Sequence, residues 1–371
     1  MKFTIKKDIL LENLNNTSKA ISSKNLIPIL SGIKFELKEE GLFLYASDTD
    51  VTIRTFIDKN KITNIEELGS IVIGGKYIVE IIRKLPDIDI NIEVIDGFKM
   101  IISTDNTEFN LNGINPEEFP NLDLNATKEP IILNTSIFKN IINQTNFATS
   151  QNESRPLLTG INFIIQNNKL EVIATDSYRL SKKEINLDTE IDNDVNVVIP
   201  SKNLVEFSKM LYDEKENLEI HLFNNKVLLK YKNIIFLSRL LSGNYPATSA
   251  IIPTDFRITI DCDFNTFFEM IDRASLLTSD HDKNTIKLEL NKTELIISSN
   301  SPEIGKVEEK INLKTEEEIK ISFSSKYMLD AIKSFNQDTI TLCMNDDSSP
   351  IVIKSKKEDT LIQLVLPIKT Y

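Results

Sequence analysis

The sequence predicts an α+β protein of three repeated domains, each with two helices against antiparallel sheets. One pattern, two apolar strands around a polar break, occurs three times, in the segments 28–48, 156–181 and 284–300. In the central copy, Ile161, Phe163 and Ile165 alternate with other side chains before the break, as in a hairpin with one buried face. The equivalent isoleucines Ile33, Ile161 and Ile286 are separated by 128 and 125 residues. The chain is therefore a threefold repeat.

Length and composition agree with three domains. The 371 residues give about 124 per repeat, which is near the usual size of a domain with its own core. Two cysteines, Cys262 and Cys343, are too few for a disulfide framework and indicate a reducing cytoplasm. No run approaches the roughly 20 apolar residues that span a bilayer, and the N-terminal segment lacks a signal-peptide core. We therefore expect a cytoplasmic protein with no membrane partner.

The elements of each repeat follow one order. A one-sided apolar helix comes first, with Asp8 expected to cap the first of these helices, and the hairpin follows. A second helix comes next, preceded by a short apolar strand and followed by two or three more strands. The expected first helices are 8–21, 136–149 and 263–278, and the second helices are 75–85, 201–211 and 325–335.

Two turn-rich segments interrupt this order at residues 115–130 and 241–253, and we interpret them as domain linkers. They divide the chain into an N-terminal domain, a central domain and a C-terminal domain. The predicted boundaries are 1–125, 126–250 and 251–371.

Catalytic signals are scarce. The nucleotide-binding and metalloprotease motifs are absent, and no cofactor is predicted. The segment Asp280-His281-Asp282 could ligate a metal, but three consecutive side chains of an extended chain do not converge on one ion, so a solvated turn is favoured. A metal-dependent hydrolase that uses this segment and the carboxylates near Asp48 remains the alternative. The threefold repeat favours a non-catalytic protein, because an active site usually needs one specialised copy.

Three lysines occupy the same position in the three repeats. Lys76, Lys202 and Lys326 fall in the first turn of each second helix, where exposed amide groups make the helix end positive and lysine is mildly unfavourable. Three such lysines in register suggest an external anion, and phosphate is the obvious candidate. The predicted helices are slightly positive in sum although the chain carries −12, so its acidity lies on strands and loops. One face can then still hold DNA weakly.

Four motifs carry a resemblance to a known family: MKFTI at the start, FPNL after the first repeat, ATDSYRL in the second and LVLPIKTY at the end. Over its whole length the chain resembles the bacterial sliding clamp, the β subunit of DNA polymerase III. The resemblance implies a homodimer whose domains join head to tail into a six-domain ring, with the helices lining a hole around duplex DNA. It implies a non-catalytic processivity factor whose partners are the polymerase III α subunit, clamp-loader subunits and other proteins with clamp-binding motifs.

The resemblance also implies site residues. DNA contacts would come from Lys24, Lys76, Arg155, Lys202 and Lys326, whereas Pro156 and Leu157 stand where some members have aromatic residues. At the dimer interface, Phe109 and Leu111 would pack near Leu276 and Leu277, with Lys76 facing Glu303. A cleft between the second and third repeats would receive short motifs such as QLxLF, next to Ala250 where some clamps have a basic residue. Its lining would be Leu158, Thr175, Ser177, Tyr178, Arg179, Leu180, Pro246, Ile251, Pro350, Val365, Leu366, Pro367 and Ile368.

Overall fold

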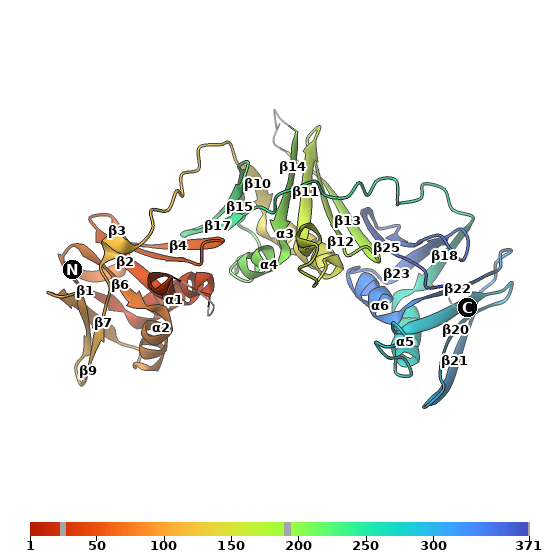
Figure 1. Cartoon of the computed structure of the whole chain (residues 1–371), viewed down its shortest axis with the longest axis horizontal. Helices are drawn as coiled ribbons and strands as arrows, with labels where there is room; N and C mark the ends of the chain where they lie inside the picture. The colour runs from red at the N-terminus through yellow and green to blue at the C-terminus, as the bar shows by residue number, and fades with distance from the viewer. Residues whose placement is uncertain (23–26, 189–193, 370–371) are drawn as a thin grey trace. The chain divides into compact units, whose positions relative to one another are not determined.

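The computed structural model describes residues 1–22, 27–188 and 194–369. Figure 1 follows the chain from β1 to β25, and each repeat contains two helices, as predicted. The first repeat comprises β1 (Lys2–Lys6), α1 (Lys7–Thr17), β2 (Gly32–Lys38), β3 (Gly41–Ser47), β4 (Val51–Asp58), β5 (Ile62–Glu67), β6 (Gly69–Gly74), α2 (Gly75–Lys84), β7 (Asp89–Ile95), β8 (Lys99–Thr104) and β9 (Thr107–Asn112).

The second and third repeats follow the same order, and their described residues contain no counterpart of β5. The second comprises β10 (Ile131–Asn134), α3 (Thr135–Thr145), β11 (Gly160–Gln166), β12 (Lys169–Thr175), β13 (Arg179–Asn186), β14 (Val195–Pro200), α4 (Ser201–Ser208), β15 (Asn217–Leu222), β16 (Lys226–Tyr231) and β17 (Ile234–Arg239). The third comprises β18 (Ile258–Asp263), α5 (Phe264–Ser275), β19 (Thr285–Leu290), β20 (Glu294–Ser301), β21 (Gly305–Asn312), β22 (Ile319–Ser324), α6 (Ser325–Lys333), β23 (Thr339–Met344), β24 (Ile351–Ser355) and β25 (Glu358–Val365).

The three predicted hairpins are confirmed. Ile161, Phe163 and Ile165 are almost fully buried, and their counterparts in the other two repeats are buried as well. The turn of the central hairpin consists of Asn167 and Asn168, whose φ angles are 50° and 58°. Two successive residues with positive φ match the twist of the flanking strands, and asparagine tolerates that backbone region better than most residues.

The helix boundaries differ from the sequence prediction in all three repeats, and each helix ends earlier than predicted. Asp8 does not cap α1. Strand β1 runs directly into the helix, so the extended residue Lys6 precedes it and Asp8 lies in the first turn. The regular helix ends at Thr17, before Ile21. A carboxylate cap is present in the third repeat, where the Asp263 carboxylate accepts a hydrogen bond of 2.8 Å from the amide of Thr266.

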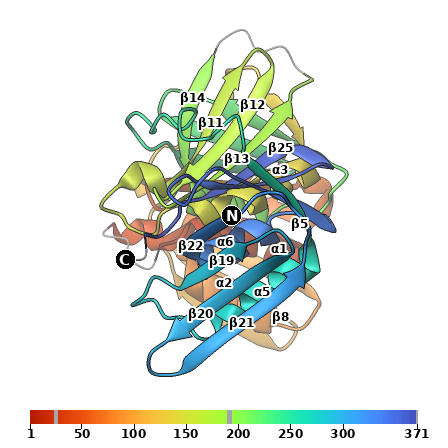
Figure 2. The ribbon, with the colours of Figure 1, turned by 90° about the vertical axis from the view of Figure 1, so that its right-hand side faces the viewer.

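The strands of the described residues form four sheets, two of which cross between repeats. One has the order β10-β15-β16-β17-β4-β3-β2-β6, in which β17 of the second repeat pairs with β4 of the first. The other has the order β14-β11-β12-β13-β25-β24-β23-β18, in which β13 pairs with β25 of the third repeat. The shorter sheets are β5-β1-β7-β8-β9 and β21-β20-β19-β22, and in Figure 2 the latter lies beside α5, which packs against it.

The contacts divide the chain into two compact units. Unit 1 is 1–138 with 202–240, and unit 2 is 139–201 with 241–371. The division runs through the second repeat because its strands pair with the first repeat at one side and with the third at the other. Among the described helices, none is long and apolar enough to cross a membrane.

Candidate functional site

Unit 2 contains a groove of about 560 Å³ built from four separate segments. The first segment is the corner before β13, the second is the loop before β19, the third is the end of β22 with the first turn of α6, and the fourth is the segment after β25. The groove is lined by Tyr178, Asp280, Lys283, Asn284, Ser324, Lys326, Tyr327, Leu366, Pro367, Ile368 and Lys369.

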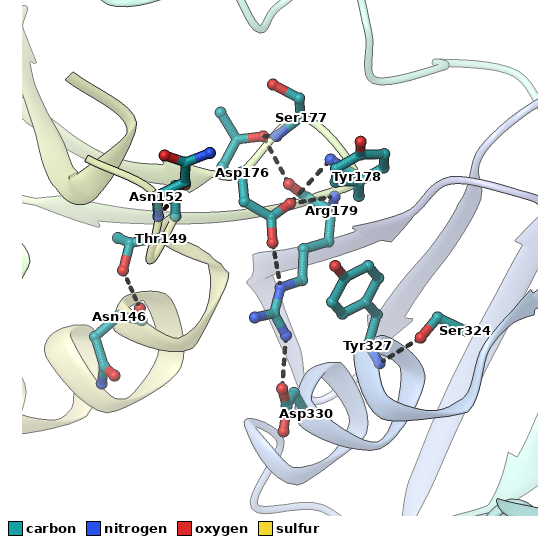
Figure 3. Close-up of polar contacts among 12 residues, drawn as sticks. Asn146, Thr149, Asn152, Asp176, Ser177, Tyr178, Arg179, Ser324, Tyr327 and Asp330 are labelled. Atoms are coloured by element: carbon teal, nitrogen blue, oxygen red, sulfur yellow. Dashed lines mark hydrogen bonds and ion pairs between the residues drawn. The ribbon is translucent and has the colours of Figure 1, made fainter. Parts of the chain in front are cut away.

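A tight corner before β13 projects Tyr178 into the open. Ser177 has a φ of 78°, and the Asp176 carboxylate accepts hydrogen bonds from the amides of Tyr178 and Arg179 at 2.9 and 3.0 Å. Figure 3 shows this network. The Tyr178 side chain is 61% exposed, and its backbone carbonyl accepts a bond of 2.9 Å from the Leu366 amide. The corner therefore holds an aromatic ring beside the C-terminal segment.

Arg179 points the other way, into the protein. Its Nε donates to Asp176 at 3.0 Å and its Nη1 donates to Asp330 of α6 at 2.6 Å. The guanidinium lies 4.5 Å from the ring centre of Tyr327 and 5.4 Å from that of Phe147 (Figure 3 draws the ion pairs). The side chain is only 10% exposed. Arg179 thus joins β13 to α6 and positions Tyr327, whose pKa is raised by burial.

The floor beneath Leu366 is apolar. Leu366 packs on a cluster that contains Ile173, Leu180 and Leu364, together with Ile252 and Phe256 of the linker after β17. Tyr245 of that linker accepts a hydrogen bond of 3.0 Å from the Thr175 amide, and burial raises the pKa of its hydroxyl.

The structure brings together only part of the cleft expected from the sequence. Tyr178, Leu366, Pro367 and Ile368 surround the groove. Four others are at most 8% exposed and do not line the groove: Leu158, Thr175, Leu180 and Val365. The remaining ones lie at the surface of unit 2 without lining the groove: Ser177, Pro246, Ile251 and Pro350.

Sequence reasoning missed Ser324 and Tyr327 as groove residues. The repeat register that drew attention to Lys326 also placed them on either side of it, so a signal was present. Sequence reasoning also missed the loop 280–284 as a wall of the groove. This loop is distant in sequence from Tyr178 and Leu366, and only folding brings the three together.

The expected DNA contacts are exposed wherever the structure describes them. Lys76, Lys202 and Lys326 are each the second residue of their helix, which confirms their common position. Arg155 is exposed, and its Nη1 donates to the Ser177 hydroxyl at 3.3 Å. Lys24 lies outside the described residues.

The expected interface residues lie at sheet edges and loop ends. Phe109 and Leu111 lie on β9, which in the described residues pairs with β8 alone, and both are partly exposed. Leu276 follows α5 and is 75% exposed, whereas Leu277 is partly buried. Glu303 is exposed in the turn between β20 and β21.

The segment Asp280-His281-Asp282 is a turn. The Asp282 carboxylate accepts hydrogen bonds from the amides of Ser279 and Asn284, at 3.0 and 3.1 Å. The Asp280 carboxylate accepts another from the Asn284 side chain. Within the described residues, no group of three or more histidine, cysteine or acidic side chains is placed to hold a metal ion.

Comparison with known proteins matches the chain along its length. Family models for the N-terminal, central and C-terminal domains of the DNA polymerase III beta subunit match residues 1–123, 132–247 and 249–369. The chain belongs to this family. It is 41% identical over 377 residues to the beta sliding clamp of Staphylococcus aureus, and the match covers all of both chains.

Solved structures agree. The DNA polymerase sliding clamp from Bacillus subtilis is 42% identical with a TM-score of 0.96, and the beta subunit from Streptococcus pyogenes is 33% identical with a TM-score of 0.95, each over the whole of both chains. These matches confirm the predicted fold and the assignment as a non-catalytic sliding clamp. The alternative of a metal-dependent hydrolase at Asp280-His281-Asp282 is not supported.

Proposed function

We propose that two copies of this chain close into a ring that slides on duplex DNA and tethers the replicative polymerase. The observation that carries the proposal is a strand-pairing rule. Strands β4, β13 and β21 are each the fourth strand of their repeat. Strand β4 pairs with β17, the last strand of the second repeat, and β13 pairs with β25, the last strand of the third. By the same rule, β21 would pair with the last strand of a first repeat, which is β9 of a second copy.

The sheet orders support this junction. In the described residues β9 and β21 are outer strands of the two short sheets. Joining them gives β1-β7-β8-β9-β21-β20-β19-β22, which is the strand order of both eight-stranded sheets, with β5 added at one end. Unpaired edges are a hazard that proteins cover, and a twofold axis would cover both pairs of edges at once and close the ring.

The rule also predicts a register. At the two observed junctions Ile53 lies opposite Phe236 and Ser181 lies opposite Gln363. The equivalent residues of the third junction are Val307 and the partner's Phe109. Both residues are partly exposed in the single chain, so pairing would bury further apolar surface.

Sedimentation tests the junction. Phe109→Asp with Val307→Asp would place two like charges opposite each other, and we expect the folded protein to sediment as a monomer at micromolar concentration. Ile132→Asp is the matched control, since Ile132 is half-exposed on β10, an outer strand that the rule leaves unpaired. A dimer mass for the double variant, with its circular dichroism unchanged, contradicts the pairing.

We propose that Lys76 and Lys202, with Arg155, Lys24 and Lys326, face DNA phosphates. Exposed lysines at helix starts add a positive charge to amide groups that already attract anions. With few direct contacts, the salt dependence of DNA retention should have a slope on the order of two to four. Lys76→Glu with Lys202→Glu should shorten residence on nicked circular DNA. An unchanged residence time would remove both lysines from this role.

We propose that the groove holds the apolar anchors of partner peptides, with affinities near micromolar. Leu366→Ala should weaken binding of a labelled peptide containing QLSLF by about tenfold or more, measured by fluorescence anisotropy. Ile304→Ala, at an exposed turn of the same unit, is the control. Truncation after Leu364 would be a poor test, because it removes the fully buried Val365 and damages the core. Equal affinity for both variants would move the partner site elsewhere.

We further propose the domain boundaries 1–125, 126–250 and 251–371 and a cytoplasmic location. The repeat periodicity supports the boundaries, and the two buried, unpaired cysteines Cys262 and Cys343 support a reducing compartment.

A further inference from the structure

A second hollow of about 520 Å³ adjoins the groove and shares three of its residues, Lys283, Ile368 and Lys369. We call it the side hollow. Its lining comes from the loop before β19, the outward face of β19 and β20, and the C-terminal segment: His281, Asp282, Lys283, Thr285, Ile286, Lys287, Ser298, Ser299, Asn300, Lys306, Ser322, Ile368 and Lys369. A peptide that leaves the groove over the shared residues would enter this hollow.

The side hollow is basic although the chain as a whole is acidic. Its lining contains four lysines and one histidine but a single carboxylate, that of Asp282. This carboxylate already accepts two backbone hydrogen bonds within its own loop. Lys287 and Lys306 are paired with Glu289 and Glu308 on the same sheet face.

Two other lysines are available to a ligand. Lys283 and Lys369 have no carboxylate within 4.0 Å in the part of the chain that the structure describes, and both are exposed. They stand on the boundary that the groove and the side hollow share. Acidic residues of a bound peptide would therefore meet these lysines directly next to an apolar anchor held in the groove.

The floor is polar, unlike that of the groove. Ser298 lies directly opposite Lys287 across the β19–β20 pair, and the outward side chain of Asn300 follows two residues later on β20. Hydroxyl and amide groups among lysines suit carboxylates and offer little to a second apolar anchor.

The walls are held in place before any ligand arrives. The Ile368 amide donates to the Ser322 carbonyl at 2.7 Å, which fixes the C-terminal segment along β22. Asn284 fixes the loop, since its amide donates to the Ser279 carbonyl at 2.7 Å and its carbonyl accepts from the Ser325 amide at 2.8 Å. A preorganised wall reduces the entropy cost of binding.

We propose that the side hollow selects partner peptides in which acidic residues flank the apolar anchor. The inference rests on the proposed role of the groove and adds a charge requirement to it. Continuity between the two hollows places the acidic residues next to the anchor, and the lysines supply the complementary charge.

Five labelled peptides test this by anisotropy: QLSLF alone, QLSLF with three glutamates at its N-terminal or its C-terminal end, and QLSLF with three glutamines at either of these ends. We expect the acidic flank at one end to strengthen binding about tenfold at 50 mM salt, with the gain largely lost at 500 mM. The glutamine flank should add little. An acidic flank that gives no gain at either end, or a glutamine flank that gives the same gain, overturns the proposal.

Lys287→Gln with Lys306→Gln provides the matched variant, because both residues line the side hollow and neither lines the groove. The change leaves their partners Glu289 and Glu308 unneutralised, so the hollow should no longer attract an acidic flank. It should remove most of the acidic gain and leave affinity for QLSLF unchanged. Lys292→Gln with Lys314→Gln, at exposed lysines outside the side hollow, should keep the gain. If the wild-type protein does not bind QLSLF at all, the proposed role of the groove is contradicted instead. A ten-nucleotide oligothymidylate tests the other occupant. If it binds more tightly than the acidic peptide and loses affinity in the variant Lys287→Gln with Lys306→Gln, the hollow binds nucleic acid and the proposal is wrong.

Discussion

Arg179→Ala should loosen the joint between β13 and α6. The change removes a guanidinium that is 10% exposed and bridges Asp176 and Asp330. Breaking a buried ion pair by removing one partner costs roughly 3–5 kcal/mol. Asp330 is 34% exposed and Asp176 keeps two backbone hydrogen bonds, so both carboxylates stay partly compensated. We therefore expect a total cost at the lower end of this range, about 3 kcal/mol, with the lost Tyr327 contact included.

Hydrogen–deuterium exchange measures this locally. If opening of β13 and α6 becomes easier by about 3 kcal/mol, their protected amides should exchange on the order of a hundredfold faster. Arg179→Lys should show most of the effect, because an ammonium cannot keep the two-sided geometry. Arg155→Ala is the control, since the exposed side chain of this arginine donates a hydrogen bond of 3.3 Å to Ser177 and bridges no carboxylates among the described residues. Exchange in Arg179→Ala that matches the control would refute the role of the network.

Two further predictions concern single groups. Burial raises the pKa of the Cys262 thiol to about 12 and also raises that of Cys343. Ellman's reagent at pH 8 should therefore find no reactive thiol in the native protein and two in urea. Rapid labelling of the native protein would contradict the burial. Hydrogen bonds from Ser348 and Ser349 lower the pKa of Asp346 to about 2. Its stabilising contribution is therefore complete above its unfolded pKa, near 3.8, and is lost as pH falls through about 2. Ser348→Ala should raise the carbon-13 titration midpoint of Asp346, and an unchanged midpoint would contradict this cause.

The repeat and its hairpins were predictable because period-two apolar spacing is a local signal. The pairing between repeats was not. Strands β4 and β17 are separated by almost 180 residues, and the alternation of each would suit any neighbouring strand equally well. Sequence spacing therefore gave three domains, whereas the backbone hydrogen bonds cross between them and divide the chain into two compact units.

The site was predictable where chemistry follows local position. Lys76, Lys202 and Lys326 were found through their shared place in a helix turn, and their exposure agrees with it. Arg179 was expected to line the cleft, but its orientation depends on Asp330, which lies 151 residues away and becomes a neighbour only in the folded protein. The side hollow could not be predicted, because it combines a turn, a sheet face and the C-terminal segment.

A covalent test of ring closure addresses the central claim most directly. Phe109→Cys with Val307→Cys would place thiols on directly opposed strand residues, where Cα separations of about 4.5–5.5 Å permit a disulfide. The native cysteines are at most 4% exposed, so they should not interfere. We predict an oxidised covalent dimer that stays on nicked circular DNA in 1 M salt and is released when the DNA is cut. Oxidised protein that leaves circular and linear DNA equally fast, or that forms no covalent dimer, would contradict a ring closed through β9 and β21.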